Sequence, residues 1–146
     1  MAHEITTDDA MLQYLRTAKR IAVLGIKTEQ QSNQPAFYVA DYLKRAGYEI
    51  VPVPVYYPEV STILSLPVHR SLASIAGEID IVDVFRRPQD ITGHLDDIIL
   101  KKPKLVWFQL GIRNDDAAKR LIEAGIDVIQ DRCMLAEHRR LIDRSA

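Results

Sequence analysis

Two consecutive arginines, Arg86 and Arg87, stand directly after an apolar run and directly before Pro88. Each guanidinium group offers several N–H donors in a planar fork, an arrangement that suits phosphate oxygens. If the apolar run is a strand and Pro88 starts a helix, both side chains leave the carboxyl end of that strand, where ligands bind in open α/β sheets. We therefore favour a phosphate-binding role for the pair. The alternative is that carboxylates neutralise one or both arginines, and the candidates are Asp83, Asp90 and Asp131.

A second candidate is the loop that follows the apolar residues 21–24 and begins with Gly25. A glycine there lets the backbone turn tightly and lets a phosphate come close, while Lys27 and Thr28 could add a charge and a hydroxyl. A dinucleotide-binding fingerprint needs two further glycines, but Lys27 and Gln30 occupy those places. The loop therefore suggests an anion site without defining one, and Gly25 could simply end a strand.

The end of the second predicted strand argues against a classical NAD site. Such a site places an Asp or Glu there to bind the ribose hydroxyls, whereas this chain has Val53, Pro54 and Val55. An apolar edge of this kind could pack against an adenine ring. It could equally be plain core and turn.

Polar groups near the last two strands offer further chemistry. Gln109 could hydrogen-bond a base or an amide. Cys133 and His138 raise the possibility of a nucleophile and its base, but residues five apart face different sides of a regular helix. We therefore expect Cys133 to be buried and inert. We expect no metal site, because the histidines show no tight ligand spacing.

The elements that must position these residues follow from the apolar spacing. Strands are predicted at residues 21–24, 48–53, 79–85, 104–110 and 126–130, with a short strand or turn at 67–69. Helices are predicted to begin after Thr7, at Pro35, at Ser71 (a brief helix to Ala76), at Pro88, after Asn114 and at Met134. This alternation predicts a doubly wound α/β fold with a mostly parallel sheet and helices on both faces. Ligands then bind beyond the carboxyl ends of the strands, where the strand order reverses.

Composition narrows the possible partners. The 146 residues carry a formal net charge of −1, so a broad nucleic-acid or membrane footprint is not indicated. The single cysteine excludes an internal disulfide and fits a reducing compartment. No apolar run approaches the roughly 20 residues of a membrane span. We expect one domain over residues 1–146, with an N-terminal helix in 1–20 and a core in 21–142, located in the cytoplasm.

Taken together, these residues resemble the small, single-domain CoA-binding proteins of bacteria, the YccU-like family. That family is related to the CoA-binding domain of the succinyl-CoA synthetase α subunit. The matching stretches run in order through the chain: IAVLGI, FYVADYLKRAGYEIVPV, IDIVDVFRRPQDI, VWFQLGIRNDDAAKRLIEAGIDVIQDRC and EHRRL. They extend from Ile21 to Leu141, and DVFRR, WFQLGI and DRC are specific in combination.

The resemblance implies a Rossmann-like CoA-binding fold and a set of site residues. It implies that the loop approaches the phosphates through Gly25, Ile26, Lys27 and Thr28. It further implies that Val53 and Pro54 flank the adenine and that the turn of Phe85, Arg86 and Arg87 closes the pocket. The chain departs from the family pattern at Lys27, which replaces a serine, and at Pro54, which replaces an asparagine. The stretches NQPAF (33–37) and VYYPEVSTILSLPVHRSL (55–72) also differ from the usual family sequence. These departures affect ligand identity more than fold.

The leading hypothesis is a stand-alone, non-catalytic module that binds CoA or an acyl-CoA. One alternative is an NAD(P)-binding redox sensor or enzyme, in which Arg86 and Arg87 would contact a 2′-phosphate. Another is a scaffold with a vestigial nucleotide pocket. The sequence leaves open whether the protein forms a homodimer.

Overall fold

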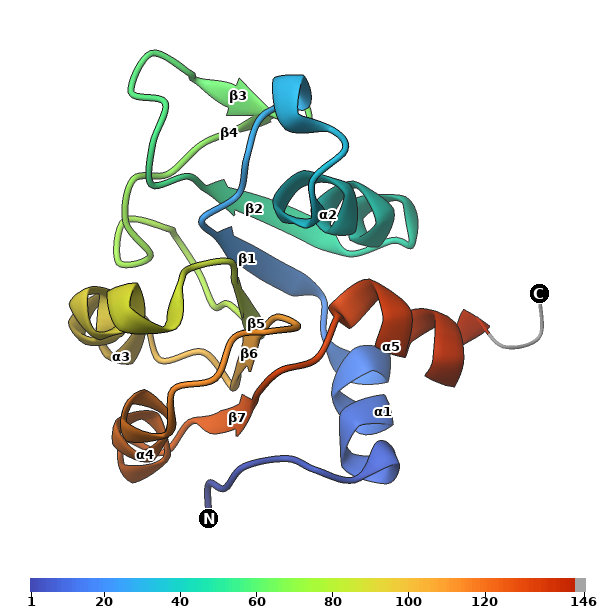
Figure 1. Cartoon of the computed structure of the whole chain (residues 1–146), viewed down its shortest axis with the longest axis vertical. Coiled ribbons are helices and arrows are strands. Elements are labelled where there is room, and N and C mark those ends of the chain that lie inside the picture. Colours follow the sequence, from blue (N-terminus) through green and yellow to red (C-terminus); the bar gives the residue numbers. More distant parts are fainter. Residues whose placement is uncertain (144–146) are drawn as a thin grey trace.

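Residues 1–143, which a computed structural model describes, form a doubly wound α/β fold around a five-stranded parallel sheet (Figure 1). The strand order is β2-β1-β5-β6-β7. The strands are β1 Arg20–Leu24, β2 Glu49–Val53, β5 Ile81–Val84, β6 Leu105–Phe108 and β7 Asp127–Ile129. All neighbours pair in parallel. The predicted fold class is confirmed.

Helices cover both faces of the sheet because successive side chains on each strand point to opposite sides. Figure 1 shows a group of helices on each side of the strands, and each group packs on its own core. The first group is α1 Asp8–Thr17, α2 Pro35–Arg45 and α5 Met134–Leu141, and the second is α3 Leu95–Lys101 and α4 Asp115–Glu123. On β6, for example, Trp107 packs into the first core and Phe108 into the second. Both side chains are fully buried.

The strand order reverses at β1, which has β2 on one side and β5 on the other. The loops that follow β1 and β5 meet there. Phe85 N–H donates to the Leu24 carbonyl at 2.9 Å, and a Cβ added to Gly25 would lie 2.3 Å from the Phe85 carbonyl oxygen. Gly25 also has a φ of +87°, which favours glycine. The single glycine therefore has a clear role, because it lets the two loops cross at the point where a ligand is expected.

Several predicted helix boundaries are confirmed. Thr7 caps α1 by accepting a hydrogen bond from the Ala10 N–H, and Asn114 caps α4 in the same way through Ala117. Pro35 is the first residue of α2. These polar caps satisfy N–H groups that have no partner inside the helix.

The predicted helix from Ser71 to Ala76 is wrong, because this segment forms turns. The N–H groups of Leu72 and Ala73 donate to the Asp97 carboxylate at 2.7 and 3.0 Å, and Ser71 and Ser74 bond to each other. Local side-chain acceptors of this kind compete with helix formation.

Two further segments differ in detail from the prediction. The helix expected at Pro88 starts as the 3₁₀ helix η2 Pro88–His94 and becomes α-helical only at Leu95. The predicted short strand near Pro67 is β4 Leu66–Pro67, which pairs with β3 Thr62–Ile63 in a small antiparallel hairpin. A further 3₁₀ turn, η1 Glu29–Gln31, lies between β1 and α2. Within residues 1–143, no helix is both long enough and apolar enough to cross a membrane.

Candidate functional site

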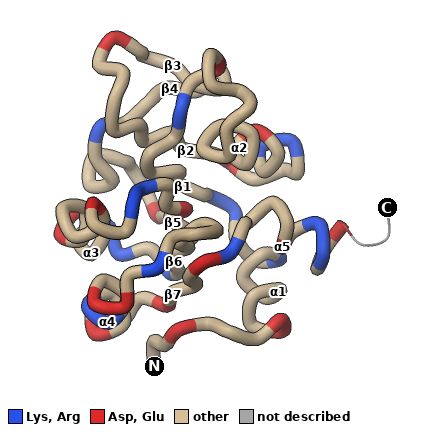
Figure 2. Tube along the Cα trace, in the orientation of Figure 1, with Lys and Arg blue, Asp and Glu red and all other residues tan. Residues whose placement is uncertain are grey.

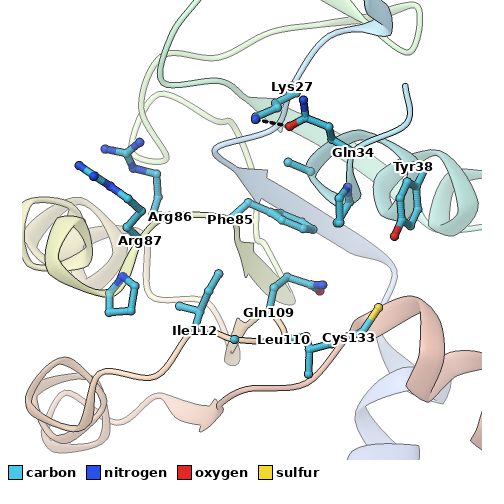
Figure 3. A pocket seen from close by; sticks show the side chains of 14 residues that line it. Lys27, Gln34, Tyr38, Phe85, Arg86, Arg87, Gln109, Leu110, Ile112 and Cys133 are labelled. Carbon is cyan, nitrogen blue, oxygen red and sulfur yellow. Dashed lines mark hydrogen bonds between the residues drawn. The ribbon is translucent and has the colours of Figure 1, made fainter. Parts of the chain in front are cut away.

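A cavity of about 490 Å³ opens beyond the carboxyl ends of β1, β5 and β6, at the reversal of strand order. Its walls come from the loops after these strands, from the start of α2 and from the residue before α5 (Figure 3). The residues that line it are Lys27, Gln34, Pro35, Ala36, Tyr38, Phe85, Arg86, Arg87, Pro88, Gln109, Leu110, Gly111, Ile112 and Cys133. Five of the predicted site residues are among them: Lys27, Phe85, Arg86, Arg87 and Gln109.

Arg86 is held firmly at one end of this cavity. Its side chain is 15% exposed, and its Nε donates to His94 Nε2 at 3.1 Å. One terminal nitrogen lies 3.4 Å from the Tyr56 hydroxyl, and the guanidinium carbon lies 5.5 Å from the centre of the Tyr56 ring. The other terminal nitrogen is 3.7 Å from Asp90, beyond hydrogen-bond distance. Both terminal nitrogens therefore keep donor capacity for an anion.

Arg87 is much less constrained, because 72% of its side chain is exposed. Its Nε donates to the Asp90 carboxylate at 2.8 Å. The hydrogen bond from Arg87 is the main reason why the pKa of Asp90 lies below its usual value. Both arginines thus approach Asp90, one of the three carboxylates considered from the sequence, while they also line the cavity.

The other two carboxylates do not neutralise the arginines. Asp131 accepts a hydrogen bond from the Gly111 N–H at 2.6 Å. Asp83 is fully buried on β5, and neither carboxyl oxygen has a hydrogen-bond partner among residues 1–143. Burial raises the pKa of Asp83 well above its usual value, so the folded protein favours the neutral acid.

The β1 loop contributes Lys27 directly, and Figure 2 shows basic positions in the loops after both β1 and β5. Lys27 Nζ donates to the side-chain oxygen of Gln34, the residue before α2 (Figure 3). This interaction places the ammonium group beside the first turn of α2, whose residues Pro35 and Ala36 also line the cavity. Pro35 has no N–H group, and the N–H groups of Phe37 and Tyr38 bond to the Gln34 carbonyl, so the helix dipole is the main feature of this first turn that favours an anion.

The remaining predicted residues of this loop lie outside the cavity wall. Gly25 forms the loop crossing, and Ile26 is buried in the core. Thr28 is 7% exposed and caps η1. Its hydroxyl donates to Gln31 Oε1 at 2.7 Å and accepts from the Gln30 N–H at 3.3 Å. In this arrangement the Thr28 hydroxyl stabilises the turn.

The residues at the end of β2 are buried and leave little surface for an adenine ring to pack against. Val53 is 1% exposed, Pro54 is also buried, and neither lines the cavity. The exposed group nearby is Tyr56, with 60% of its surface accessible. Sequence reasoning missed the contact between Tyr56 and Arg86, because nothing in the proline-rich segment predicts which side chain turns back toward the β5 loop.

Gln109 and Cys133 lie at the other end of the cavity, away from the two guanidinium groups (Figure 3). Gln109 is 3% exposed, and its side-chain oxygen accepts a hydrogen bond from the Met134 N–H at 3.1 Å. Cys133 is partly exposed, so the expectation of a buried thiol is wrong. It directly precedes α5, packs against the first core and also lines the cavity.

His138 lies elsewhere and does not act on Cys133. Its Nδ1 is 2.8 Å from the Tyr42 hydroxyl, and its ring packs edge-on against Tyr42 and Tyr48. Burial lowers the pKa of His138. A Cys–His pair is therefore not assembled in this cavity.

A parallel α/β fold with a cavity at its reversal of strand order defines a protein of the Rossmann-like class. The chain belongs to the CoA-binding domain family: the family model described as "CoA binding domain" matches residues 19–139. The family inferred from the sequence resemblance is confirmed.

Relatives match over most of their length. The uncharacterized protein YneT of Bacillus subtilis (strain 168) is 34% identical over 126 residues, which cover 86% of this chain and 90% of YneT. A solved structure from Thermus thermophilus, cell-free ID.343, is 39% identical with a TM-score of 0.86, covering 94% of this chain and all of that one. A hypothetical protein from Pyrococcus horikoshii OT3 is 31% identical with a TM-score of 0.84, covering 94% and 93%.

Proposed function

We propose that the protein binds CoA or an acyl-CoA in this cavity and contributes no catalytic group of its own. The observation that carries the proposal is the polarity of the site. Cationic side chains lie at one end, and apolar walls lead to an amide and a thiol at the other (Figure 3). CoA has the same order of groups, from phosphates through an amide-containing arm to sulfur.

The phosphates belong at the end formed by Arg86 and Lys27. Arg86 is held by His94 and Tyr56 and still has free donors, so little side-chain entropy is lost when it binds an anion. Lys27 adds a second charge next to the first turn of α2. Charge-assisted hydrogen bonds of this kind are stronger than neutral ones.

The arm of CoA belongs along the apolar part of the wall. Phe85, Pro35, Tyr38 and Ile112 provide that wall, and small-molecule sites typically combine such surface with a few placed polar groups. The amide nitrogen of Gln109 is a donor suited to a carbonyl of the arm. The adenosine then extends over the rim toward the exposed Tyr56, next to Arg86.

Two observations favour this function over the alternatives. Val53 and Pro54 end β2 without a carboxylate for the ribose of NAD. Among the described residues, the cavity wall contains no His, Asp or Glu, and His138 is held by Tyr42. A binding role therefore fits the wall better than general acid–base chemistry does.

Calorimetric titration of the purified, ligand-free protein with CoA in the presence of a reductant tests the proposal. NADPH and ATP are the matched controls, because both carry phosphates and adenine but lack the arm. We expect CoA to bind at least about tenfold more tightly than either control, a difference of about 1.4 kcal/mol. Equal or tighter binding of NADPH would support the redox alternative, and no binding of any of the three would refute the proposal.

A further inference from the structure

The sulfur of Cys133 faces the cavity from the end opposite the two arginines (Figure 3). The residue is partly exposed. It occupies the N-cap position of α5, and its side chain makes no capping hydrogen bond there. The thiol is therefore accessible from the cavity and is not committed to holding the helix.

Gln109 provides independent evidence that this end of the cavity is built for a ligand. Only 3% of the residue is exposed, and its side-chain oxygen accepts a hydrogen bond from the Met134 N–H. Because Oε1 accepts this hydrogen bond, the other polar atom of the Gln109 amide, Nε2, is the donor that remains. Within residues 1–143, Gln109 Nε2 donates to no protein acceptor, and it is not among the fully buried atoms without a partner, so it is open to the cavity that Gln109 lines beside Cys133. A ligand in the cavity can supply an acceptor for this donor.

We propose that Cys133 undergoes thiol–disulfide exchange with the disulfide form of the ligand and holds one CoA as a mixed disulfide. This inference rests on the proposed function, because the cavity must first place the ligand's sulfur next to Cys133. Phosphates held near Arg86 leave the arm pointing toward the thiol end of the cavity. The ligand class is thus a phosphate-bearing thiol in its oxidised form.

The exchange is balanced without a further oxidant. The thiolate of Cys133 attacks one sulfur of CoA disulfide, the S–S bond of that disulfide breaks, and a new S–S bond joins Cys133 to one CoA. The other CoA leaves as a thiolate and takes up a proton. Cys133 is oxidised, and the departing CoA is reduced. External thiols reverse the reaction by the same route.

The sequence favours persistence of the adduct. Cys133 is the only cysteine of the chain, so no second thiol of the same molecule can resolve the mixed disulfide. The protein therefore keeps the bound CoA until an external thiol releases it. In this way the site responds to the redox state of the CoA pool.

Intact-protein mass spectrometry tests the proposal. Reduced protein is mixed with CoA disulfide, and parallel samples receive glutathione disulfide or pantetheine disulfide, which lacks the phosphates and adenosine. We expect one CoA adduct per chain, formed at least about tenfold faster than either control adduct, which corresponds to an activation free energy lower by about 1.4 kcal/mol. Cys133→Ser should form none, and dithiothreitol should remove the adduct.

The outcomes separate this inference from the proposed function. Calorimetry with reduced CoA and a reductant reports binding without exchange. If CoA binds in that assay but forms no adduct, or if glutathione disulfide reacts as fast as CoA disulfide, the exchange proposal is wrong and the binding proposal stands. If CoA does not bind in that assay, the binding proposal fails. Desulfo-CoA keeps the phosphates and adenosine but lacks the sulfur, so it should compete for the cavity and slow adduct formation with CoA disulfide; that result supports both proposals. An adduct rate unchanged by saturating desulfo-CoA would show that the reaction does not use the cavity and would overturn the exchange proposal.

Discussion

The two arginines should contribute unequally to CoA binding, although the sequence alone treats them alike. The test is a pair of matched substitutions, Arg86→Gln and Arg87→Gln. Both remove one guanidinium group and keep a polar side chain of moderate length. Arg86 is 15% exposed and is oriented by His94 and Tyr56, whereas Arg87 is 72% exposed and bonded to Asp90.

The expected magnitudes follow from these environments. A hydrogen bond to a charged, partly buried group contributes about 1.5–3 kcal/mol, so Arg86→Gln should raise the Kd for CoA roughly 10- to 150-fold. An exposed ion pair is worth much less because water screens it, so Arg87→Gln should raise the Kd at most about fivefold.

Calorimetric titration of the wild type and both variants measures the difference. Circular dichroism melting curves serve as the control, because Arg86 also contacts His94 and Tyr56 and its loss could affect the fold. A folded Arg86→Gln protein with wild-type affinity would refute the assignment of this end to phosphate. A larger effect from Arg87→Gln would show that the exposed arginine, not the fixed one, binds the anion.

Three further predictions concern the fold that carries the site. Gly25→Ala should lower the free energy of unfolding by roughly 2–5 kcal/mol in urea titration, because its Cβ would clash with Phe85 and adopt a positive φ; wild-type stability would contradict the crossing. Asp83→Val should raise the free energy of unfolding by about 1–3 kcal/mol. The gain should be larger at pH 7 than at pH 4, because the pKa of Asp83 is raised only in the folded protein, so the wild type loses stability as pH rises. Burial and Arg86 lower the pKa of His94, so the free energy of unfolding should fall as pH drops below about 6.5. His94→Gln should make melting temperature depend less on pH in this range; an unchanged pH dependence would show that His94 is not its cause.

Much of the fold was predictable because local signals agree with the tertiary structure. Thr7, Pro35 and Asn114 mark helix starts through capping chemistry that acts within a few residues. The buried strands are short apolar runs that only a doubly covered parallel sheet accommodates. The prediction of a brief helix at Ser71 was wrong because N–H groups of this segment bond to Asp97, a residue distant in sequence.

The site was predictable in its position but not in its details. The reversal of strand order places the β1 and β5 loops together, so Gly25 and Arg86 could be expected near one another. Which side chains face the cavity depends on geometry that no local pattern encodes. Thr28 turns inward to cap η1, while Cys133 remains accessible because α5 begins one residue later.

The central claim is that CoA occupies the cavity beyond β1, β5 and β6. Titration of ¹⁵N-labelled protein with reduced CoA, followed by NMR, tests both binding and location. We predict that the amide signals of residues 25–28, 85–88 and 109–112 and of Cys133 shift together and saturably. Shifts concentrated instead around His138, or no shifts with any amount of CoA, would contradict the account.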